Sequence, residues 1–292
     1  MVQTLTPTNR KETATAENVD FGKVQFPKGH TFEGNETIVA MPPITKENLA
    51  ASTDWSNLFR GCTKLKKAVL PDKDDITSLS RIFENCTALE SVTLPKSLDM
   101  CTDVIRILAE CVNLKHAIIP NLPKVTTIYS CVYGCGNLMT LKVGDIATQV
   151  ANRVNISWFC YNCKGVTDAE FGDLGNCTIG NGDYTFYLAN CNNFNVKKLP
   201  MVDIPAMAGF AYMSKLTPQS YANIFAALPF NTGDSELTIY LNATSLNAAK
   251  ATTGKYTATD VYDTTTKKEQ SKSLTINDWI TAATNKGWII NS

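Results

Sequence analysis

The sequence has little net charge and no long apolar run. Its 292 residues hold 27 basic and 27 acidic side chains, so no overall field concentrates nucleic acid or an anionic membrane at its surface. No window reaches the roughly 18 consecutive apolar residues of a membrane span. Residues 1–10 contain no basic segment followed by an apolar one. We therefore expect a chain that binds no nucleic acid, spans no membrane and is made without a secretion signal.

The residue patterns of common catalytic sites are also missing. The two histidines, His30 and His116, lie in no nucleophile motif such as Gly-x-Ser-x-Gly, and His116 falls at a strand position where an exposed side chain is the simpler interpretation. The glycine-rich stretch 175–182 lacks the lysine of a phosphate-binding loop and is expected to be a turn between coils. The sequence predicts no enzyme and no cofactor.

Cysteine, in contrast, is abundant, with ten residues. Cys160-x-x-Cys163 and Cys131-x-x-x-Cys135 have spacings that could hold zinc, but further ligands are not evident nearby, so we expect no metal site. Free thiols in this number favour assembly in a reducing cytoplasm over export through an oxidising compartment. Six cysteines recur at one position of a repeat and are interpreted as a structural ladder of small buried side chains. These are Cys62, Cys86, Cys111, Cys135, Cys163 and Cys191.

Internal periodicity is the strongest signal in the chain. The six ladder cysteines are separated by 24, 25, 24, 28 and 28 residues, and these intervals suit a leucine-rich repeat of about 20–29 residues. Apolar side chains recur seven positions before each cysteine and three and eight positions after it. In the last unit these positions are Tyr184, Phe194 and Leu199.

Each unit predicts one coil of a solenoid. Residues 80–85 form an irregular or helical arm, a Cys-x-x-Leu corner follows, and residues 91–94 alternate as a short strand that ends at Pro95. One coil cannot bury its own apolar face, so neighbouring coils stack and their strands pair in parallel. The expected fold is an α/β repeat solenoid: a right-handed, leucine-rich-repeat-like coil stack with a parallel β-sheet, an N-terminal cap and a C-terminal αβ cap.

The residues of these units carry a family resemblance. Residues 83–95, Phe-Glu-Asn-Cys-Thr-Ala-Leu-Glu-Ser-Val-Thr-Leu-Pro, resemble the BspA-like leucine-rich repeat, whose units run roughly Phe-x-x-Cys-x-x-Leu-x-x-Ile-x-Ile-Pro, and residues 58–65 match almost as well. The resemblance covers about residues 50–215, and the last units depart from the pattern, with Cys160 in the place of phenylalanine. It implies a surface protein that binds other proteins or host matrix, or a phage-encoded structural protein with similar repeats.

The flanking segments predict a division into three parts. Residues 1–50 lack the repeat and are expected to be an N-terminal arm and cap, followed by the solenoid at 51–215. Residues 216–292 are expected to be C-terminal capping repeats with a polar loop at 252–272. Within this last part, the sequence predicts a helix from Thr217, a strand at 236–241, a helix at 275–285 and a closing strand at 288–290.

These observations favour a structural or binding protein. The first expectation is a bacteriophage virion component (tail, fibre or capsid-decorating protein) that is assembled in the host cytoplasm within a larger homo- or hetero-oligomer. Its partners would be other virion proteins, or a host-surface protein or glycan. A bacterial cell-surface adhesin or secreted ligand-binding protein is the alternative.

The sequence also suggests which residues would contact a partner. In the arms, aromatic anchors could be added by Tyr129, Tyr133 and Tyr161. Strand alternation predicts a binding face formed by Lys67, Ser91, Thr93, His116 and Lys142.

Overall fold

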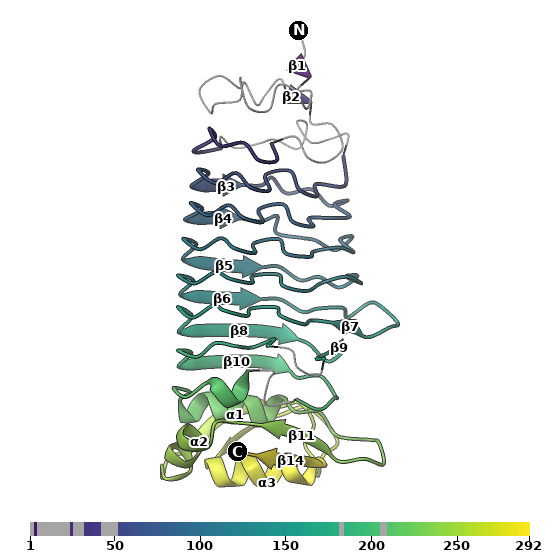
Figure 1. The fold of residues 1–292 in the computed structure, drawn as a ribbon. Helices are drawn as coiled ribbons and strands as arrows, with labels where there is room; N and C mark the ends of the chain where they lie inside the picture. The colour runs from purple at the N-terminus through teal and green to yellow at the C-terminus, as the bar shows by residue number, and fades with distance from the viewer. Residues whose placement is uncertain (1–2, 5–23, 26–31, 42–51, 181–183, 205–208) are drawn as a thin grey trace.

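The chain folds as a stack of coils closed at its C-terminal end by helices. The computed structural model describes residues 3–4, 24–25, 32–41, 52–180, 184–204 and 209–292. Figure 1 shows short strands lying one above the other along one side of the stack, with the helical segment at the end where the chain finishes. The described part is a parallel β-solenoid of about five turns followed by a segment of helices and strands, which confirms the predicted fold class.

The strands of the main sheet are short and parallel. β3 pairs with β4, and β5, β6, β8 and β10 pair consecutively. Alternate side chains point into the core: in β5, Ala117 and Ile119 are buried whereas His116 and Ile118 are exposed. This two-residue alternation fixes which side chains reach solvent. The strand bounds are β3 (Lys67–Val69), β4 (Ser91–Thr93), β5 (His116–Ile119), β6 (Thr140–Val143), β8 (Asp168–Asp173) and β10 (Asn193–Lys198).

Smaller ladders connect the coils away from the main sheet. Isolated parallel bridges join Asp54, Ser78, Asp103 and Thr127 in consecutive coils. Two further parallel pairs are β7 (Val154–Asn155) with β9 (Cys177–Thr178), and β1 (Gln3–Thr4) with β2 (Val24–Gln25). The stretch 175–182, which the sequence predicts as a turn, therefore contains a strand. Its backbone pairs because Val154 N donates to Asn176 O at 3.0 Å.

The arms are irregular turns without an α-helix. Arg81 N, for example, donates to Ile105 O of the next coil at 2.7 Å, so this N–H is not available for an intrahelical bond. In five arms, two positions also adopt a left-handed backbone, and in the first described coil Gly34 does so. One column holds Asn57, Arg81, Arg106, Ser130 and Trp158, and the other holds Gly34, Gly61, Asn85, Glu110, Gly134 and Asn162.

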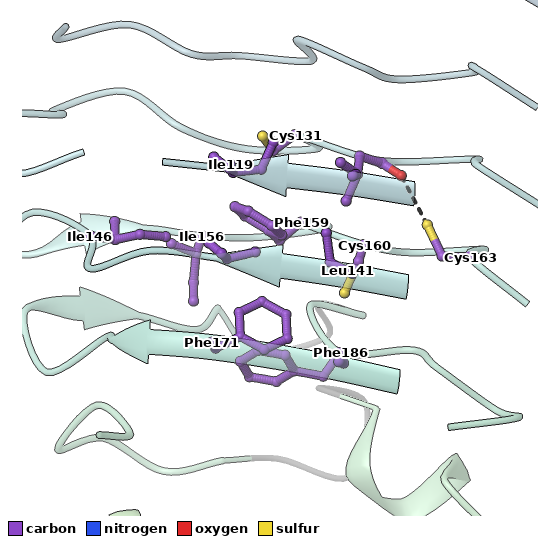
Figure 2. Packing of buried hydrophobic residues seen from close by; sticks show 14 of the residues in the cluster. Ile119, Cys131, Leu141, Ile146, Ile156, Phe159, Cys160, Cys163, Phe171 and Phe186 are labelled. Carbon is purple, nitrogen blue, oxygen red and sulfur yellow. Dashed lines mark hydrogen bonds between the residues drawn. The ribbon is translucent and has the colours of Figure 1, made fainter. Parts of the chain in front are cut away.

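The interior is a continuous column of apolar side chains. Phe32, Phe59 and Phe83 stack face to face in consecutive coils, with ring centroids 5.2 and 5.6 Å apart. Figure 2 shows the packing further along the stack, where Phe171 and Phe186 lie below Phe159 and Leu141. Because every coil places an apolar side chain against the coils before and after it, no single coil forms its core alone.

Cysteines form a second buried column, and their thiols are hydrogen-bonded. The Cys86 thiol donates to Phe59 O at 3.1 Å and the Cys111 thiol to Phe83 O at 3.2 Å, each acceptor lying three residues before the ladder cysteine of the preceding coil. Figure 2 marks the equivalent bond from Cys163, which reaches Val132 O at 2.9 Å. Burial raises the pKa of the Cys62 thiol to about 12.

The prediction that Cys191 belongs to the cysteine ladder is wrong. Phe194 pairs with Ala169 in the sheet, and Cys191 N donates to Leu188 O as Val166 N donates to Cys163 O. Leu188 therefore occupies the corner position, and Cys191 lies three residues beyond it. Its thiol accordingly donates to its own neighbour Asn193 O at 3.4 Å. Tyr184, Phe194 and Leu199 also lie outside the columns that the sequence alignment gives them, since Val196, not Leu199, pairs with Phe171.

An additional coil lies within the segment interpreted as the N-terminal arm and cap. Phe32 N donates to Leu58 O at 2.9 Å and Met41 N to Lys67 O at 3.3 Å, so residues 32–41 stack on the following coil. Asn35 stands where the next five coils have cysteine, and its Oδ1 accepts from Ile38 N at 3.0 Å. Much of the predicted arm, with His30, lies outside the described residues.

The C-terminal segment begins with a helix that covers the last strand of the sheet. Thr217 caps α1 by accepting from Ser220 N, and Pro218 opens the helix, as the sequence predicts. α2, capped by Asn242, was not predicted. The helices are α1 (Pro218–Ala227), α2 (Ala243–Lys250) and α3 (Ile276–Asn285), with a 3-10 turn at Phe210–Tyr212 before them.

Two strand pairs complete this segment. β11 (Leu237–Tyr240) and β14 (Trp288–Asn291) are parallel, and β12 (Tyr256–Asp260) and β13 (Gln270–Leu274) form an antiparallel hairpin within the predicted polar loop. The hairpin is anchored next to its turn: Asp260 pairs with Gln270 and is 1 % exposed, and its Oδ1 lies 2.5 Å from the Nζ of buried Lys286.

Candidate binding surfaces

The outer face of the main sheet presents a regular array of exposed side chains. All five residues predicted for a binding face lie there with exposed side chains: Lys67, Ser91, Thr93, His116 and Lys142. Their positions follow from strand alternation, since the residues between them point into the core. Their contact with a ligand stays a prediction.

Hydrogen bonds and ion pairs connect neighbouring strands across this face. His116 Nδ1 lies 2.8 Å from Thr140 Oγ1, and Lys142 Nζ lies 3.1 Å from Glu170 Oε1. Asp168 accepts from the Thr167 hydroxyl and from Asn193 Nδ2, both at 2.6 Å. These donors, with Thr167 the larger contribution, lower the pKa of the Asp168 carboxyl. The face therefore has an ordered polar surface.

Ile118 interrupts this polar array. It is 65 % exposed, the largest fraction among the exposed large apolar side chains of the described residues. It borders two hollows of about 430 and 480 Å³, both of which Lys142 also lines. The sequence analysis named His116 on this strand but not Ile118, although the same alternation places both on one face.

Helix α1 forms one wall of the hollow of about 430 Å³. Ser220 Oγ accepts from Phe194 N at 2.8 Å and donates to Asn192 O at 2.9 Å, so its side chain occupies the edge of β10 where another strand would pair. Asn223 Nδ2 donates to Phe194 O at 3.2 Å. The helix thus protects the sheet edge, and Gln219 and Asn223 contribute polar groups to the hollow.

The arms form a second surface, which changes character along the stack. Backbone hydrogen bonds align two neighbouring columns of arm residues from coil to coil. The first column runs Glu33, Arg60, Glu84, Ala109, Tyr133, Tyr161 and Tyr187, and the second runs Asn57, Arg81, Arg106, Ser130, Trp158 and Tyr184. We call the part with Glu33, Arg60, Arg81, Glu84 and Arg106 the charged half. The aromatic half comprises Tyr129, Tyr133, Trp158, Tyr161, Tyr184, Tyr187 and Tyr212.

Glu84 is the centre of the charged half. Its side chain is 9 % exposed, its Oε1 contacts Arg106 Nε, and its Oε2 lies 3.6 Å from Arg81 Nη1. Arg60 Nε lies 3.0 Å from Oε2 but out of line for a hydrogen bond, so that contact is ionic. Arg60 also pairs with Glu33 at 3.1 Å. One buried carboxylate therefore contacts three arginines from consecutive coils.

Tyr161 is the centre of the aromatic half. Its ring lies 5.0 Å from Trp158, 5.5 Å from Tyr133 and 4.9 Å from Tyr184, measured between centroids. The rings are tilted or edge to face, the arrangements that aromatic pairs favour. Arg106 joins the two halves, because its guanidinium carbon lies 5.4 Å from the centroid of Tyr133.

Neither pair of cysteines with zinc-like spacing contributes to a cluster of metal ligands. The Cys160 thiol donates to Thr185 O at 2.8 Å, and the Cys135 thiol donates to Leu108 O at 3.1 Å. Within the described ranges, His, Cys, Asp and Glu side chains form no group of three or more that could hold an ion. No helix in the described part of the chain has the length and apolar character needed to cross a bilayer.

The stacked coils, the parallel sheet and its exposed outer face define a leucine-rich-repeat-like solenoid. Residues 55–167 match the family model of the BspA type leucine-rich repeat region in six copies, so this part of the chain is a BspA-type leucine-rich repeat region. No curated protein and no solved structure matched the chain. Repeats of this family are generally non-catalytic and suggest protein binding, and no enzyme is indicated. β8 and β10 continue the same sheet beyond the matched residues.

Proposed function

We propose that this chain is a non-enzymatic binding protein whose protein partner docks on the outer face of the main sheet. The observation that carries the proposal is Ile118, an exposed apolar side chain between two hollows on a rigid polar surface. Protein interfaces concentrate their binding energy in a few buried anchors surrounded by polar groups that exclude water. Ile118 has the chemistry of such an anchor, and Lys142 and Glu170 have the chemistry of its surroundings.

The preorganisation of the face supports the same proposal. Each strand is held by its neighbours, and the Asp168 and His116 side chains are already hydrogen-bonded to adjacent strands. A partner that docks there orders few side chains, so little conformational entropy opposes binding.

The biological setting that we propose is a bacteriophage virion, in which the chain contacts neighbouring structural proteins or the host surface. All ten thiols are free and buried, which supports assembly in a reducing compartment. A bacterial surface adhesin is the alternative setting. Quantitative proteomics on purified phage particles and on separated envelope fractions distinguishes the two: stoichiometric recovery with virions supports the first setting, and recovery only in the envelope contradicts it.

The docking face is tested by Ile118→Asp. A buried charge at an interface anchor is costly. We therefore expect the recovery of the variant with the particle or envelope to fall at least about tenfold. A tenfold change in a binding constant corresponds to about 1.4 kcal/mol. Ile289→Asp is the matched control, because Ile289 is also an outward strand isoleucine, at 42 % exposure, but lies in the C-terminal segment. Normal recovery of Ile118→Asp, or equal loss in both variants, would contradict the proposal.

A further inference from the structure

The arm surface contains a groove at the boundary between the charged and aromatic halves. The groove has a volume of about 600 Å³, within the range of roughly 300–1,000 Å³ that small-molecule sites occupy. Tyr129, Tyr133 and Trp158 supply its aromatic surfaces, and Thr127 and Asn155 supply polar ones. It shares no lining residue with the hollows beside Ile118, so it does not depend on the proposed function.

The aromatic surfaces of the groove are held in place. Trp158 packs edge to face on Tyr161, and Tyr133 is fixed between Tyr161 and the guanidinium of Arg106. Tyr129 is 40 % exposed, and Tyr133 and Trp158 are partly exposed. The groove therefore offers ring faces that are already fixed, so a ligand does not have to immobilise these side chains when it binds.

The polar groups of the groove are neutral. Asn155 and Thr127 are exposed, and Oδ1 of Asn155 accepts from Ser157 N at 2.7 Å, so its amide N–H groups can donate to a ligand. No carboxylate lines the groove. Its one cation, Arg106, is held by its ion pair with buried Glu84 and by its contact with the Tyr133 ring. The groove therefore contains one ion-paired cation and no carboxylate, and its other polar groups are neutral.

We propose that this groove binds a neutral oligosaccharide. A pyranose ring has an apolar face of C–H groups, which packs on an aromatic ring, and an edge of hydroxyl groups, which donate to and accept from amides and hydroxyls. Both surfaces are present here in a concave site that fits a short saccharide. A protein partner would instead need a surface of about 800 Å² on each side.

Tryptophan fluorescence gives a direct readout of this site. Trp158 is partly exposed and lines the groove, whereas Trp55, Trp279 and Trp288 are each at most 2 % exposed. A sugar that covers Trp158 should shift its emission and protect it from a soluble quencher such as iodide.

The experiment screens the full chain against an array of neutral glycans and then titrates β-1,4-linked glucose, α-1,4-linked glucose and β-1,4-linked N-acetylglucosamine hexasaccharides. We expect saturable binding to at least one neutral glycan, with the affinity nearly unchanged between about 0.05 and 0.5 M salt, because the glycan carries no charge that salt could screen. Absence of binding to every neutral glycan at millimolar concentration would overturn the proposal.

Matched variants locate the binding. Trp158→Ala and Tyr129→Ala should each weaken affinity about tenfold, which corresponds to about 1.4 kcal/mol, while Trp158→Phe retains most of it. Tyr212→Ala is the control, because Tyr212 is similarly exposed, at 43 %, but lies outside the groove. Circular dichroism establishes that each variant is folded. Equal affinity of all the variants for the glycan rejects the oligosaccharide site. The same conclusion follows if Trp158→Ala and Tyr129→Ala lose binding to a protein partner but keep their affinity for the glycan.

Discussion

The charged and aromatic halves of the arm surface occupy equivalent backbone positions with opposite chemistry. Tyr133 and Tyr161 stand in the same column as Arg60 and Glu84, and Trp158 shares the left-handed backbone of Arg106. The coil geometry therefore does not dictate which side chains the arms carry. In the charged half the side chains satisfy one another around a buried carboxylate, whereas in the aromatic half they leave ring faces open to solvent.

This difference indicates a difference in role. Ion pairs between consecutive coils stabilise the stack only while both partners are present, because removal of one leaves an uncompensated charge. Partly exposed tyrosines and a tryptophan, in contrast, are the residue types enriched where proteins bind ligands and partners. We therefore expect substitutions in the charged half to change stability first, and substitutions in the aromatic half to change binding first.

The largest expected effect acts on the interior beneath both halves. Burial raises the pKa of Cys62 and Cys177 from 9.0 to about 12. Because the folded pKa is the higher one, these thiols contribute stability that is complete below about pH 9 and is lost as the pH rises toward 12. Each contributes a loss of about 1.4 kcal/mol per pH unit in that window. Urea unfolding followed by circular dichroism should therefore show a midpoint that changes little up to about pH 9 and falls steeply from about pH 9 to pH 11.

Thiol labelling provides the control for this pH effect. At pH 8 the native chain should leave its ten buried cysteines unreacted with an aromatic disulfide reagent, and all ten should react in urea. Two results would contradict the buried column of cysteines. One is a thiol that reacts in the native chain as fast as it does in the unfolded chain, and the other is an unfolding midpoint that does not depend on pH.

The next effect separates the two halves. Glu84→Gln removes the negative charge that three arginines contact, and we expect it to lower the free energy of unfolding by about 3 kcal/mol. The measurement is urea unfolding at pH 7. Glu90→Gln is the matched control, because the Glu90 side chain is 61 % exposed and its one ion pair, with Lys66, is long at 3.9 Å. This substitution should lower the free energy of unfolding by no more than about 0.5 kcal/mol. Similar costs for the two variants would show that the Glu84 cluster does not stabilise the stack.

A smaller effect is expected in the aromatic half. Tyr161→Ala removes ring contacts to Trp158, Tyr133 and Tyr184 from a partly exposed site, and the expected cost is about 1–2 kcal/mol. Since no charge is involved, this cost should be the same at low and high salt, unlike that of Glu84→Gln. A salt-dependent cost for Tyr161→Ala would remove the distinction between the halves.

The repeat made most of the fold predictable from the sequence. A fixed interval of apolar residues requires stacking, and stacking requires parallel strands, so periodicity alone leads to the solenoid. Thr217, Pro218 and Thr275 carried enough local capping chemistry to place α1 and α3. The register of the last unit was not predictable in this way, because Cys191 recurs at the expected interval while Leu188 fills the corner.

The surfaces were predictable in part. Alternation exposed His116 and Lys142, and the same rule placed Ile118 outward, but an isoleucine in a strand is also typical of the core. The groove depends on the stacking of two coils, in which Ser130 N donates to Ser157 O, a bond between residues 27 positions apart. Aligning the arm columns from coil to coil would have revealed the change from charged to aromatic residues, whereas the groove between them required the structure.

The central claim is that the ion pairs of the charged half stabilise the stack, whereas the groove lined by Tyr129, Tyr133 and Trp158 binds a neutral oligosaccharide. Its most direct test is the affinity of the wild-type chain, Glu84→Gln and Trp158→Ala for the best-binding neutral glycan, measured by titration under conditions in which all three are folded. The account predicts that Trp158→Ala weakens binding about tenfold and that Glu84→Gln, although less stable, binds within about twofold of the wild type. Equal affinity for Trp158→Ala and the wild type, or a greater loss in Glu84→Gln than in Trp158→Ala, would contradict it.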